Sequence, residues 1–221
     1  MTPDESEVSE LDPRVTALLV VDVQNDFCHA DGYFARFGFD VTPCADVVPR
    51  IAGAVTTARR RGLQVVWTMS TNSDPPHHRL RPARFRRQRA DGRPPDQFVP
   101  CSWGWSLVDA LAPDDGELVV RKPRYDAFLR TTLEDDLRAR GTTTVVVAGV
   151  ITNCCVDTTA RSAFMRGFDV LVLGDCVATF AEERDLHDAA LLNLDRLFAV
   201  VADSAAFERA LDARVAGRSA P

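Results

Sequence analysis

Short runs of β-branched and aliphatic residues alternate with helical segments along most of this chain. Six runs are typical of buried strands, at residues 17–21, 64–67, 118–120, 144–148, 170–173 and 198–201. Strands that alternate with helices predict a parallel sheet covered on both faces. We therefore expect an α/β protein, a three-layer α/β/α sandwich around a six-stranded parallel sheet, with ligands bound beyond the carboxyl ends of the strands.

The segments between these strands contain residues typical of helix starts and helix ends. Thr42 and Pro43 are expected to begin a helix whose apolar positions 47, 51, 55 and 58 share one face, and Gly62 to end it. The spacing of a capping box predicts two more helix starts, at Thr131 with Glu134 and at Thr179 with Glu182.

Length and composition describe an ordinary globular chain of 221 residues, with 46% hydrophobic and 26% charged residues. We expect a single domain over residues 13–215, an insertion loop at 70–105 and a disordered N-terminal tail at 1–12. A net charge of -6 predicts no general attraction to nucleic acid, and no apolar run approaches the roughly 20 residues of a membrane span. The acidic N-terminus does not resemble a signal peptide, so we expect a cytoplasmic protein with no nucleic-acid or membrane partner. The six cysteines (28, 44, 101, 154, 155 and 176) contain no CxxC spacing and are expected to be reduced thiols.

Lys122 is the only lysine among 26 basic residues. A lysine ammonium is a compact point charge, whereas the arginine guanidinium is planar and forked, so the two cannot replace each other in a small reactive site. Lys122 is therefore a candidate catalytic residue. The alternative is a surface lysine that survived a coding bias by chance.

Three reactive side chains fall at predicted strand ends. Asp22 closes the first strand, Lys122 follows the third, and Cys155 begins the helix after the fourth. Carboxyl ends of parallel strands share one edge, and a thiol at a helix start beside an ammonium can have its pKa lowered by about one to several units. Each residue also has a structural explanation, as a loop cap, a surface charge and a small core side chain. Their joint placement favours a nucleophilic site.

Three segments carry a resemblance to a known family: Val21-Asp-Val-Gln-Asn-Asp-Phe27, Lys122-Pro-Arg-Tyr125 and Gly149-Val-Ile-Thr-Asn-Cys-Cys155-Val156. In order and spacing they resemble the isochorismatase-like cysteine hydrolases, and the resemblance extends over residues 15–207. It implies an isochorismatase-like, Rossmann-like fold and a catalytic triad of Asp22, Lys122 and Cys155. In this family the nucleophile directly precedes a valine, which selects Cys155 over Cys154.

The same resemblance implies further features of the site. A cis peptide bond is expected between Val150 and Ile151, and the backbone N–H groups of Ile151 and Cys155 are expected to form an oxyanion hole. No cofactor is required, and the family habit is a homodimer or homotetramer.

Motifs that differ between members of this superfamily restrict the reaction expected of this chain. Nicotinamidases carry an Asp-x-His metal cluster after the second strand, which is missing from residues 68–78, so we expect no metal. Isochorismatases, which cleave a vinyl ether, lack a cysteine at the position of Cys155. Ureidoacrylate amidohydrolases resemble the chain at Ser102-Trp103, Leu107-Val108-Asp109, Lys122–Tyr125, Thr152-Asn153 and Cys155-Val156.

The implied activity is hydrolysis of a C–N bond in a small ureido, carbamoyl or other non-peptide amide, through an acyl-enzyme. Biuret hydrolases, N-carbamoylsarcosine amidases and streptothricin hydrolases are related alternatives. Vinyl-ether hydrolysis and a non-catalytic binding scaffold are further ones.

The loop at 70–105 is rich in arginine, at 79, 81, 84, 86, 87, 89 and 93. These side chains could meet a carboxylate substrate, a sister subunit or RNA, and subunit contact or solvation is favoured. The candidate substrate-binding residues are Phe27, Asn72, Trp103, Trp105 and Tyr125. The four aromatic members serve equally well as core or interface residues. His29 and His187 have no evident role.

Overall fold

A computed structural model of the chain describes residues 8, 10–71 and 98–217, and the side chains up to 213. Within these ranges six parallel strands form one sheet in the order β3-β2-β1-β4-β5-β6. The strands are β1 (Thr16–Val21), β2 (Gln64–Ser70), β3 (Leu118–Lys122), β4 (Thr144–Val150), β5 (Asp169–Ala178) and β6 (Val200–Ala202). The predicted α/β fold with its six-stranded parallel sheet is confirmed.

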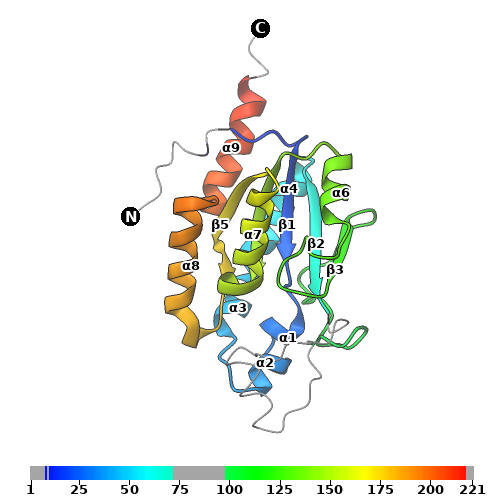
Figure 1. Cartoon of the computed structure of the whole chain (residues 1–221), viewed down its shortest axis with the longest axis vertical. Coiled ribbons are helices and arrows are strands. Elements are labelled where there is room, and N and C mark those ends of the chain that lie inside the picture. Colours follow the sequence, from blue (N-terminus) through cyan, green and yellow to red (C-terminus); the bar gives the residue numbers. More distant parts are fainter. Residues whose placement is uncertain (1–7, 9, 72–97, 218–221) are drawn as a thin grey trace.

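Short and long helices connect these strands (Figure 1). They are α1 (Asn25–Cys28), α2 (Tyr33–Arg36), α3 (Thr42–Asp46), α4 (Val48–Arg60), α6 (Leu133–Ala139), α7 (Asp157–Met165), α8 (Arg184–Leu197) and α9 (Ser204–Gly217). A π-helical turn η1 (Thr152–Val156) precedes α7, and a 3-10 turn η2 (Ala181–Glu183) precedes α8. Among the described residues, none of these helices combines the length and apolarity needed to cross a bilayer.

The helix predicted from Thr42 to Gly62 is in fact two helices, α3 and α4, which meet at Val47. Pro49 explains the break, because proline has no N–H to donate to the carbonyl of residue 45 and its ring clashes with that carbonyl.

Both predicted capping boxes are wrong. Thr131 donates its hydroxyl to the carbonyl of Ala127 at 2.6 Å, and α6 begins two residues later. Thr179 donates to the side chain of Asn153 at 2.7 Å. Thr131 Oγ1 also accepts a hydrogen bond from the N–H of Leu133 at 3.4 Å, but Glu134 pairs with Arg138 and Arg166 and does not close a capping box. The hydroxyl of Thr179 binds a tertiary acceptor instead of the helix terminus.

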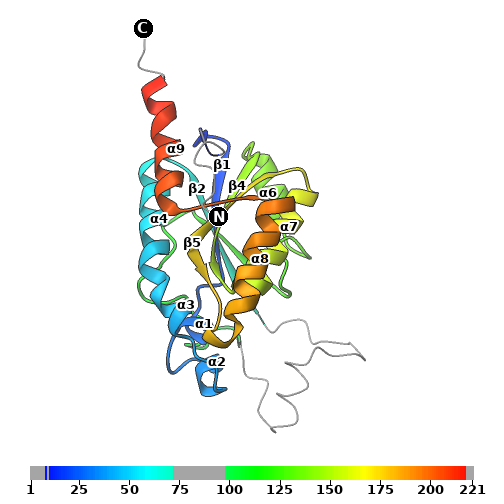
Figure 2. The same ribbon diagram turned by 90° about the vertical axis from the view of Figure 1, so that its left-hand side faces the viewer.

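Each face of the sheet is covered by its own helices (Figure 2). Alternate strand residues point to opposite faces: Leu18 and Val20 pack in the core under α4 and α9, whereas Leu19 and Val21 pack in the core under α6, α7 and α8. Because both faces are covered, the strands read as continuous apolar runs, as the sequence suggested.

The chain is packed from Leu11 onward. Leu11 is buried and its N–H donates to the carbonyl of Ala210 in α9 at 3.1 Å. Most of the tail predicted over residues 1–12 lies outside the described residues. Val8 also packs against the core, so contacts with the core begin before the predicted domain boundary at 13.

The order of the strands reverses between β1 and β4, from which connections run outward in both directions. In open parallel sheets ligands bind at the carboxyl ends of the strands next to such a reversal. The segments after β1 and β4 therefore occupy the expected ligand-binding edge, which is the end of the sheet nearest α1 in Figure 1.

Gly149 allows β1 and β4 to approach each other closely at this edge. Its φ is +120°, and a Cβ placed there would lie 2.1 Å from the carbonyl oxygen of Val21. Gly149→Ala should therefore lower the free energy of unfolding by at least about 2 kcal/mol, since backbone atoms have to move apart. Urea denaturation followed by circular dichroism measures this change.

Gly167 offers the matched control. Its φ is also positive, at +78°, but a Cβ there would meet nothing within 4 Å. Gly167→Ala should cost only the backbone preference of about 1 kcal/mol. Equal destabilisation by the two changes would contradict the role assigned to the contact with Val21.

Candidate active site

Strand register brings Asp22 to the ligand-binding edge. Val21 pairs with Thr68 of β2 on one side and with Gly149 of β4 on the other, and Asp22 follows directly. Its φ of 52° lies in the left-handed region, which few non-glycine residues adopt. Asp22 is fully buried, with a side-chain exposure of 0%.

Two hydroxyl groups of β2 hold the Asp22 carboxylate. Thr68 Oγ1 donates to Asp22 Oδ1 at 2.7 Å, and Ser70 Oγ donates to Asp22 Oδ2 at 2.8 Å. The sequence analysis missed both residues. A signal was present, because Thr68 and Ser70 are polar residues on one face of an otherwise apolar strand, at its carboxyl end.

Lys122 ends β3 opposite Ser70 and is fully buried. Its Nζ lies 2.6 Å from Asp22 Oδ2 and 3.3 Å from Cys155 Sγ. It also donates to Ser70 Oγ at 3.1 Å and to the carbonyl of Arg124 at 3.0 Å. An ammonium has three protons for these four acceptors, so the hydrogen bonds are shared among them.

Cys155 lies in η1, directly beyond β4, with 2% of its surface exposed. The peptide bond between Val150 and Ile151, just before this turn, is cis, as the resemblance implied. The structure thus brings together Asp22, Lys122 and Cys155, with Lys122 Nζ in contact with both partners.

The pKa of the Cys155 thiol is raised well above its ordinary value. The hydrogen bond with Cys154 raises it most, followed by burial, and the negative charge of Asp22 adds to these effects. The positive charge of Lys122 opposes them and is outweighed. The lowered thiol pKa expected from the sequence is therefore wrong: the surroundings of Cys155 raise it.

Lys122 keeps its proton despite its burial. Burial lowers the pKa of its ammonium, but the charges of Asp22 and Cys155 outweigh burial, and the pKa is raised. Lys122 is therefore a charged ammonium in contact with both Asp22 and Cys155.

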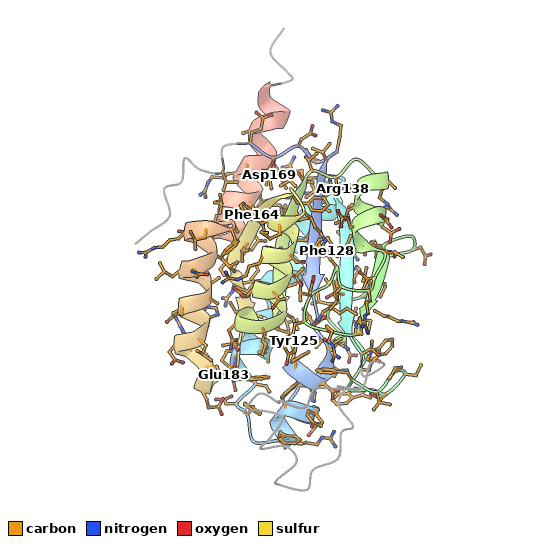
Figure 3. All side chains as sticks on the ribbon, in the orientation of Figure 1. Tyr125, Phe128, Arg138, Phe164, Asp169 and Glu183 are labelled. Atoms are coloured by element: carbon orange, nitrogen blue, oxygen red, sulfur yellow. The ribbon has the colours of Figure 1, made fainter. Side chains whose placement is uncertain are left out.

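The turn that carries Cys155 is fixed from β5, η2 and α8. Asn153 Nδ2 donates to Glu183 Oε2 at 3.0 Å, and Thr179 Oγ1 donates to Asn153 Oδ1 at 2.7 Å. His187 Nδ1 lies 2.8 Å from Thr152 Oγ1, so this histidine, for which the sequence analysis found no role, also supports the turn. Figure 3 shows Glu183 at the same end of the molecule as Tyr125, away from Asp169.

Residues of α1 anchor the chain where it returns at Phe98. The Asp26 carboxylate accepts hydrogen bonds from the N–H groups of Tyr33 at 3.1 Å and Phe98 at 2.8 Å. Gly104 passes so close to Asp26 that a Cβ there would lie 2.0 Å from its Oδ1. Gln24 Nε2 donates to the carbonyl of Trp105 at 2.7 Å.

The predicted substrate-binding residues differ in how deeply they are buried. Phe27 is buried in an aromatic cluster, stacked on Phe34 with ring centroids 5.0 Å apart. Trp105 is nearly buried, whereas Trp103 and Tyr125 are about half exposed. Asn72 and the arginine-rich stretch at 79–93 lie outside the described residues. Phe27 and Trp105 are thus buried and Trp103 and Tyr125 partly exposed, and a role of these four residues in substrate binding stays a prediction.

All six cysteines, which lie within the described ranges, are free thiols. In that part of the chain no group of three or more His, Cys, Asp or Glu side chains is arranged to hold a metal ion. His77 and His78 lie outside it.

Comparisons with known proteins show the family to which the chain belongs. The family model "Isochorismatase domain" matches residues 16–206. Ureidoacrylate amidohydrolase RutB of Methylobacterium radiotolerans is 40% identical over 220 residues, which cover 95% of this chain and 84% of that protein.

Solved structures show the same fold. A cysteine hydrolase from Pseudomonas syringae pv. phaseolicola superposes with a TM-score of 0.77 at 26% identity, covering 91% of this chain and 94% of the other. N-carbamoylsarcosine amidase from Thermoplasma acidophilum gives a TM-score of 0.66 at 28% identity, covering 86% and 96% of the two chains.

Proposed function

Because the chain belongs to the isochorismatase family, we propose that it is a cysteine amidohydrolase that cleaves a C–N bond of a small ureido or carbamoyl compound. The observation that carries the proposal is the position of Lys122 Nζ, 2.6 Å from Asp22 Oδ2 and 3.3 Å from Cys155 Sγ. A carboxylate and an ammonium beside a buried thiol form the arrangement of an activated nucleophile.

The first step is attack by sulfur on the carbonyl carbon of the substrate. Asp22 removes the proton from the Cys155 thiol, and Lys122 stabilises the thiolate by its positive charge. A base is needed because the thiol pKa is raised in the ligand-free site. A carbon–sulfur bond forms, and the carbonyl oxygen becomes an oxyanion.

Backbone N–H groups of Ile151 and Cys155 are proposed to bind this oxyanion. No described residue accepts a hydrogen bond from the N–H of Ile151, which is the N–H of the cis Val150–Ile151 peptide. Loss of one such donor typically costs on the order of 3 kcal/mol of transition-state stabilisation.

Collapse of the intermediate breaks the C–N bond. Asp22 returns the proton to the leaving amine, and the acyl group stays on sulfur as a thioester or, from a ureido substrate, a thiocarbamate. Asp22 then accepts a proton from water, whose oxygen attacks the acyl carbon and releases the acid. The sulfur leaves as thiolate and regains a proton, which restores the starting site without any cofactor.

The substrate class is proposed from two observations. The named relatives act on ureidoacrylate and on N-carbamoylsarcosine, both small molecules with a ureido group. Cysteine also suits acyl transfer, whereas it has no evident task in the protonation of a vinyl ether. The biuret-type and streptothricin-type amides are second choices.

The purified protein should hydrolyse ureidoacrylate and N-carbamoylsarcosine with kcat/KM at least about 10-fold above that for nicotinamide or biuret, since a pocket shaped for one amide discriminates by a few kcal/mol. Release of ammonia measures turnover. Intact-protein mass spectrometry of a rapidly quenched reaction should reveal the acyl group on the wild type and none on Cys155→Ala.

Two outcomes would contradict the proposal. Cleavage of isochorismate without cleavage of any amide would point to vinyl-ether chemistry. Turnover of ureido acids by Cys155→Ala at the wild-type rate would exclude an acyl-enzyme on this sulfur.

A further inference from the structure

Two side chains at the start of α8 hold adjacent residues of η1, the turn that carries Cys155. Glu183 Oε2 accepts a hydrogen bond from Asn153 Nδ2 at 3.0 Å, and His187 Nδ1 lies 2.8 Å from Thr152 Oγ1. Glu183 is the N-cap residue of α8 and His187 follows four residues later, so both side chains reach the same side of the helix. Figure 3 shows Glu183 at the end of α8 that lies toward the ligand-binding edge. We refer to Glu183 and His187 as the α8 clamp.

The Asn153 amide is held at both of its ends. Its nitrogen donates to Glu183, while its oxygen accepts the hydroxyl of Thr179 at 2.7 Å. A rotated amide would direct its oxygen at the Glu183 carboxylate, and two acceptors facing each other repel. The Asn153 side chain therefore has one favourable orientation, which restrains the backbone of η1 at this residue.

The Thr152 hydroxyl is fully buried, and its contact with His187 satisfies it. A buried hydroxyl that loses its partner costs about 1–3 kcal/mol, so this contact restrains both residues. The pKa of His187 is lowered, mainly by burial. The ring is therefore neutral at pH 7, where one of its nitrogens can accept a hydrogen bond and the other can donate one.

The two residues held by the clamp lie between the groups that carry the proposed chemistry. Thr152 directly follows Ile151, whose N–H is a proposed oxyanion donor, and Asn153 precedes Cys155 by two residues in the same turn. A shift of the backbone at Thr152 or Asn153 therefore displaces both the oxyanion donors and the sulfur. Misplacement by about 1 Å can lower the rate of a reaction about 100-fold.

We propose that Glu183 and His187 are positioning residues for the acyl-transfer step. Through Asn153 and Thr152 they hold the sulfur and the backbone N–H groups of η1 in the geometry that attack requires. This role rests on the proposed function and adds to the triad two residues that act without touching the substrate. Loss of the clamp should therefore lower kcat and leave KM nearly unchanged.

The second half of α8 has its own attachments to the protein. Leu194 is fully buried, and Leu191 packs against the same core. Asn193 accepts a hydrogen bond from Arg161 of α7. Because these contacts lie away from the start of the helix, loss of one clamp contact should leave α8 in place and loosen η1.

Variants of Thr152 and His187 test the first contact. Thr152→Val removes the hydroxyl and keeps the shape, so it should lower kcat for a ureido acid at least about 10-fold with KM within about two-fold. His187→Ala should have the same effect, and the double variant should be no slower than the slower single variant, because both changes act through one contact. Thr152→Ser, which keeps the hydroxyl, should retain most of the activity.

Variants of Glu183 test the second contact independently. Glu183→Ala removes the acceptor of Asn153 and should lower kcat at least about 10-fold. Glu183→Gln keeps an oxygen that can accept the same hydrogen bond, so it should recover most of that loss. Asp188→Asn is the control on the same helix: Asp188 pairs with the exposed Arg184 at 3.0 Å, and its variant should keep the wild-type kcat.

The measurements are steady-state kinetics with a ureido acid and mass spectrometry of rapidly quenched reactions, in which the clamp variants should accumulate the acyl-enzyme more slowly. Urea denaturation establishes that each variant is folded, and the Glu183 pair decides the question if Thr152→Val is not.

Three results would overturn the positioning role. They are wild-type kcat in Thr152→Val, His187→Ala and Glu183→Ala, equal losses in Thr152→Ser and Glu183→Gln, or a double variant whose losses simply multiply. Cys155→Ala distinguishes this role from the proposed function. If Cys155→Ala is inactive while the clamp variants are unaffected, only the positioning role is rejected; if Cys155→Ala hydrolyses ureido acids at the wild-type rate, both are rejected.

Discussion

Cys155→Ala is expected to abolish hydrolysis, with kcat/KM falling by about 10⁴-fold or more, as for other nucleophiles that act as part of a unit. Cys155 is the sulfur that Lys122 Nζ contacts, at 3.3 Å, and it is buried at the ligand-binding edge of the sheet. Alanine keeps the small side chain and the turn but removes the group that forms the acyl bond. Steady-state kinetics with a ureido acid measures the loss.

Cys154→Ala is the matched control and should keep most of the activity. Its hydrogen bond is the largest contribution to the raised pKa of Cys155, so its removal should lower that pKa. The rising limb of the pH profile of kcat/KM should then move to lower pH, because less alkaline solution suffices to form the thiolate. Equal loss of activity in both variants, or a shift of the limb to higher pH, would show that the nucleophile has been assigned to the wrong sulfur.

Lys122→Arg is expected to lower kcat/KM by about 10³-fold or more even though it keeps the positive charge. The Lys122 side chain is fully buried, and its Nζ fits between Asp22 Oδ2 and Cys155 Sγ, within 3.3 Å of both. A planar guanidinium is wider and donates in a fixed fork, so it cannot occupy that position without displacing the carboxylate or the sulfur. Kinetic assays on folded protein measure the effect.

Lys122→Met tests the role of the positive charge separately from the length of the side chain. Methionine approximates the length of the lysine side chain but leaves Asp22 buried without its counter-ion, which should lower the free energy of unfolding by about 3–5 kcal/mol. Arg140→Lys, at an exposed position after α6, is the reciprocal control and should change neither activity nor stability. A Lys122→Arg enzyme with wild-type kinetics would refute the requirement for a compact ammonium.

The strands, and with them the fold, could be predicted from local sequence. Residues such as Leu18, Leu19, Val20 and Val21 are apolar on both sides of the strand because helices cover both faces of a parallel sheet, so the runs stand out without any long-range information. The same local patterns predicted that Asp22, Lys122 and Cys155 lie at strand ends. Lys122 was a candidate catalytic residue also because it is the only lysine in the sequence. Family motifs added the choice of Cys155 and the cis bond before it.

The interactions among these residues depend on packing between distant segments of the chain. The register that sets Ser70 opposite Lys122 and Thr68 beside Val21 depends on neighbouring strands, and it supplies the two hydroxyls that hold Asp22. The raised pKa of Cys155 is due first to the hydrogen bond with its neighbour Cys154, and burial and the charge of Asp22, which come from residues distant in sequence, add to it.

The failed capping boxes have a related cause. The local pattern at Thr179 fits a helix start, but the hydroxyl finds the side chain of Asn153, 26 residues earlier in the chain, and stabilises the turn that carries Cys155 instead. Local sequence thus determined which segments form strands and where reactive groups fall along them. Distances, hydrogen-bond partners and charge states arose from packing between segments far apart in the chain, because those quantities depend on neighbours that no local pattern contains.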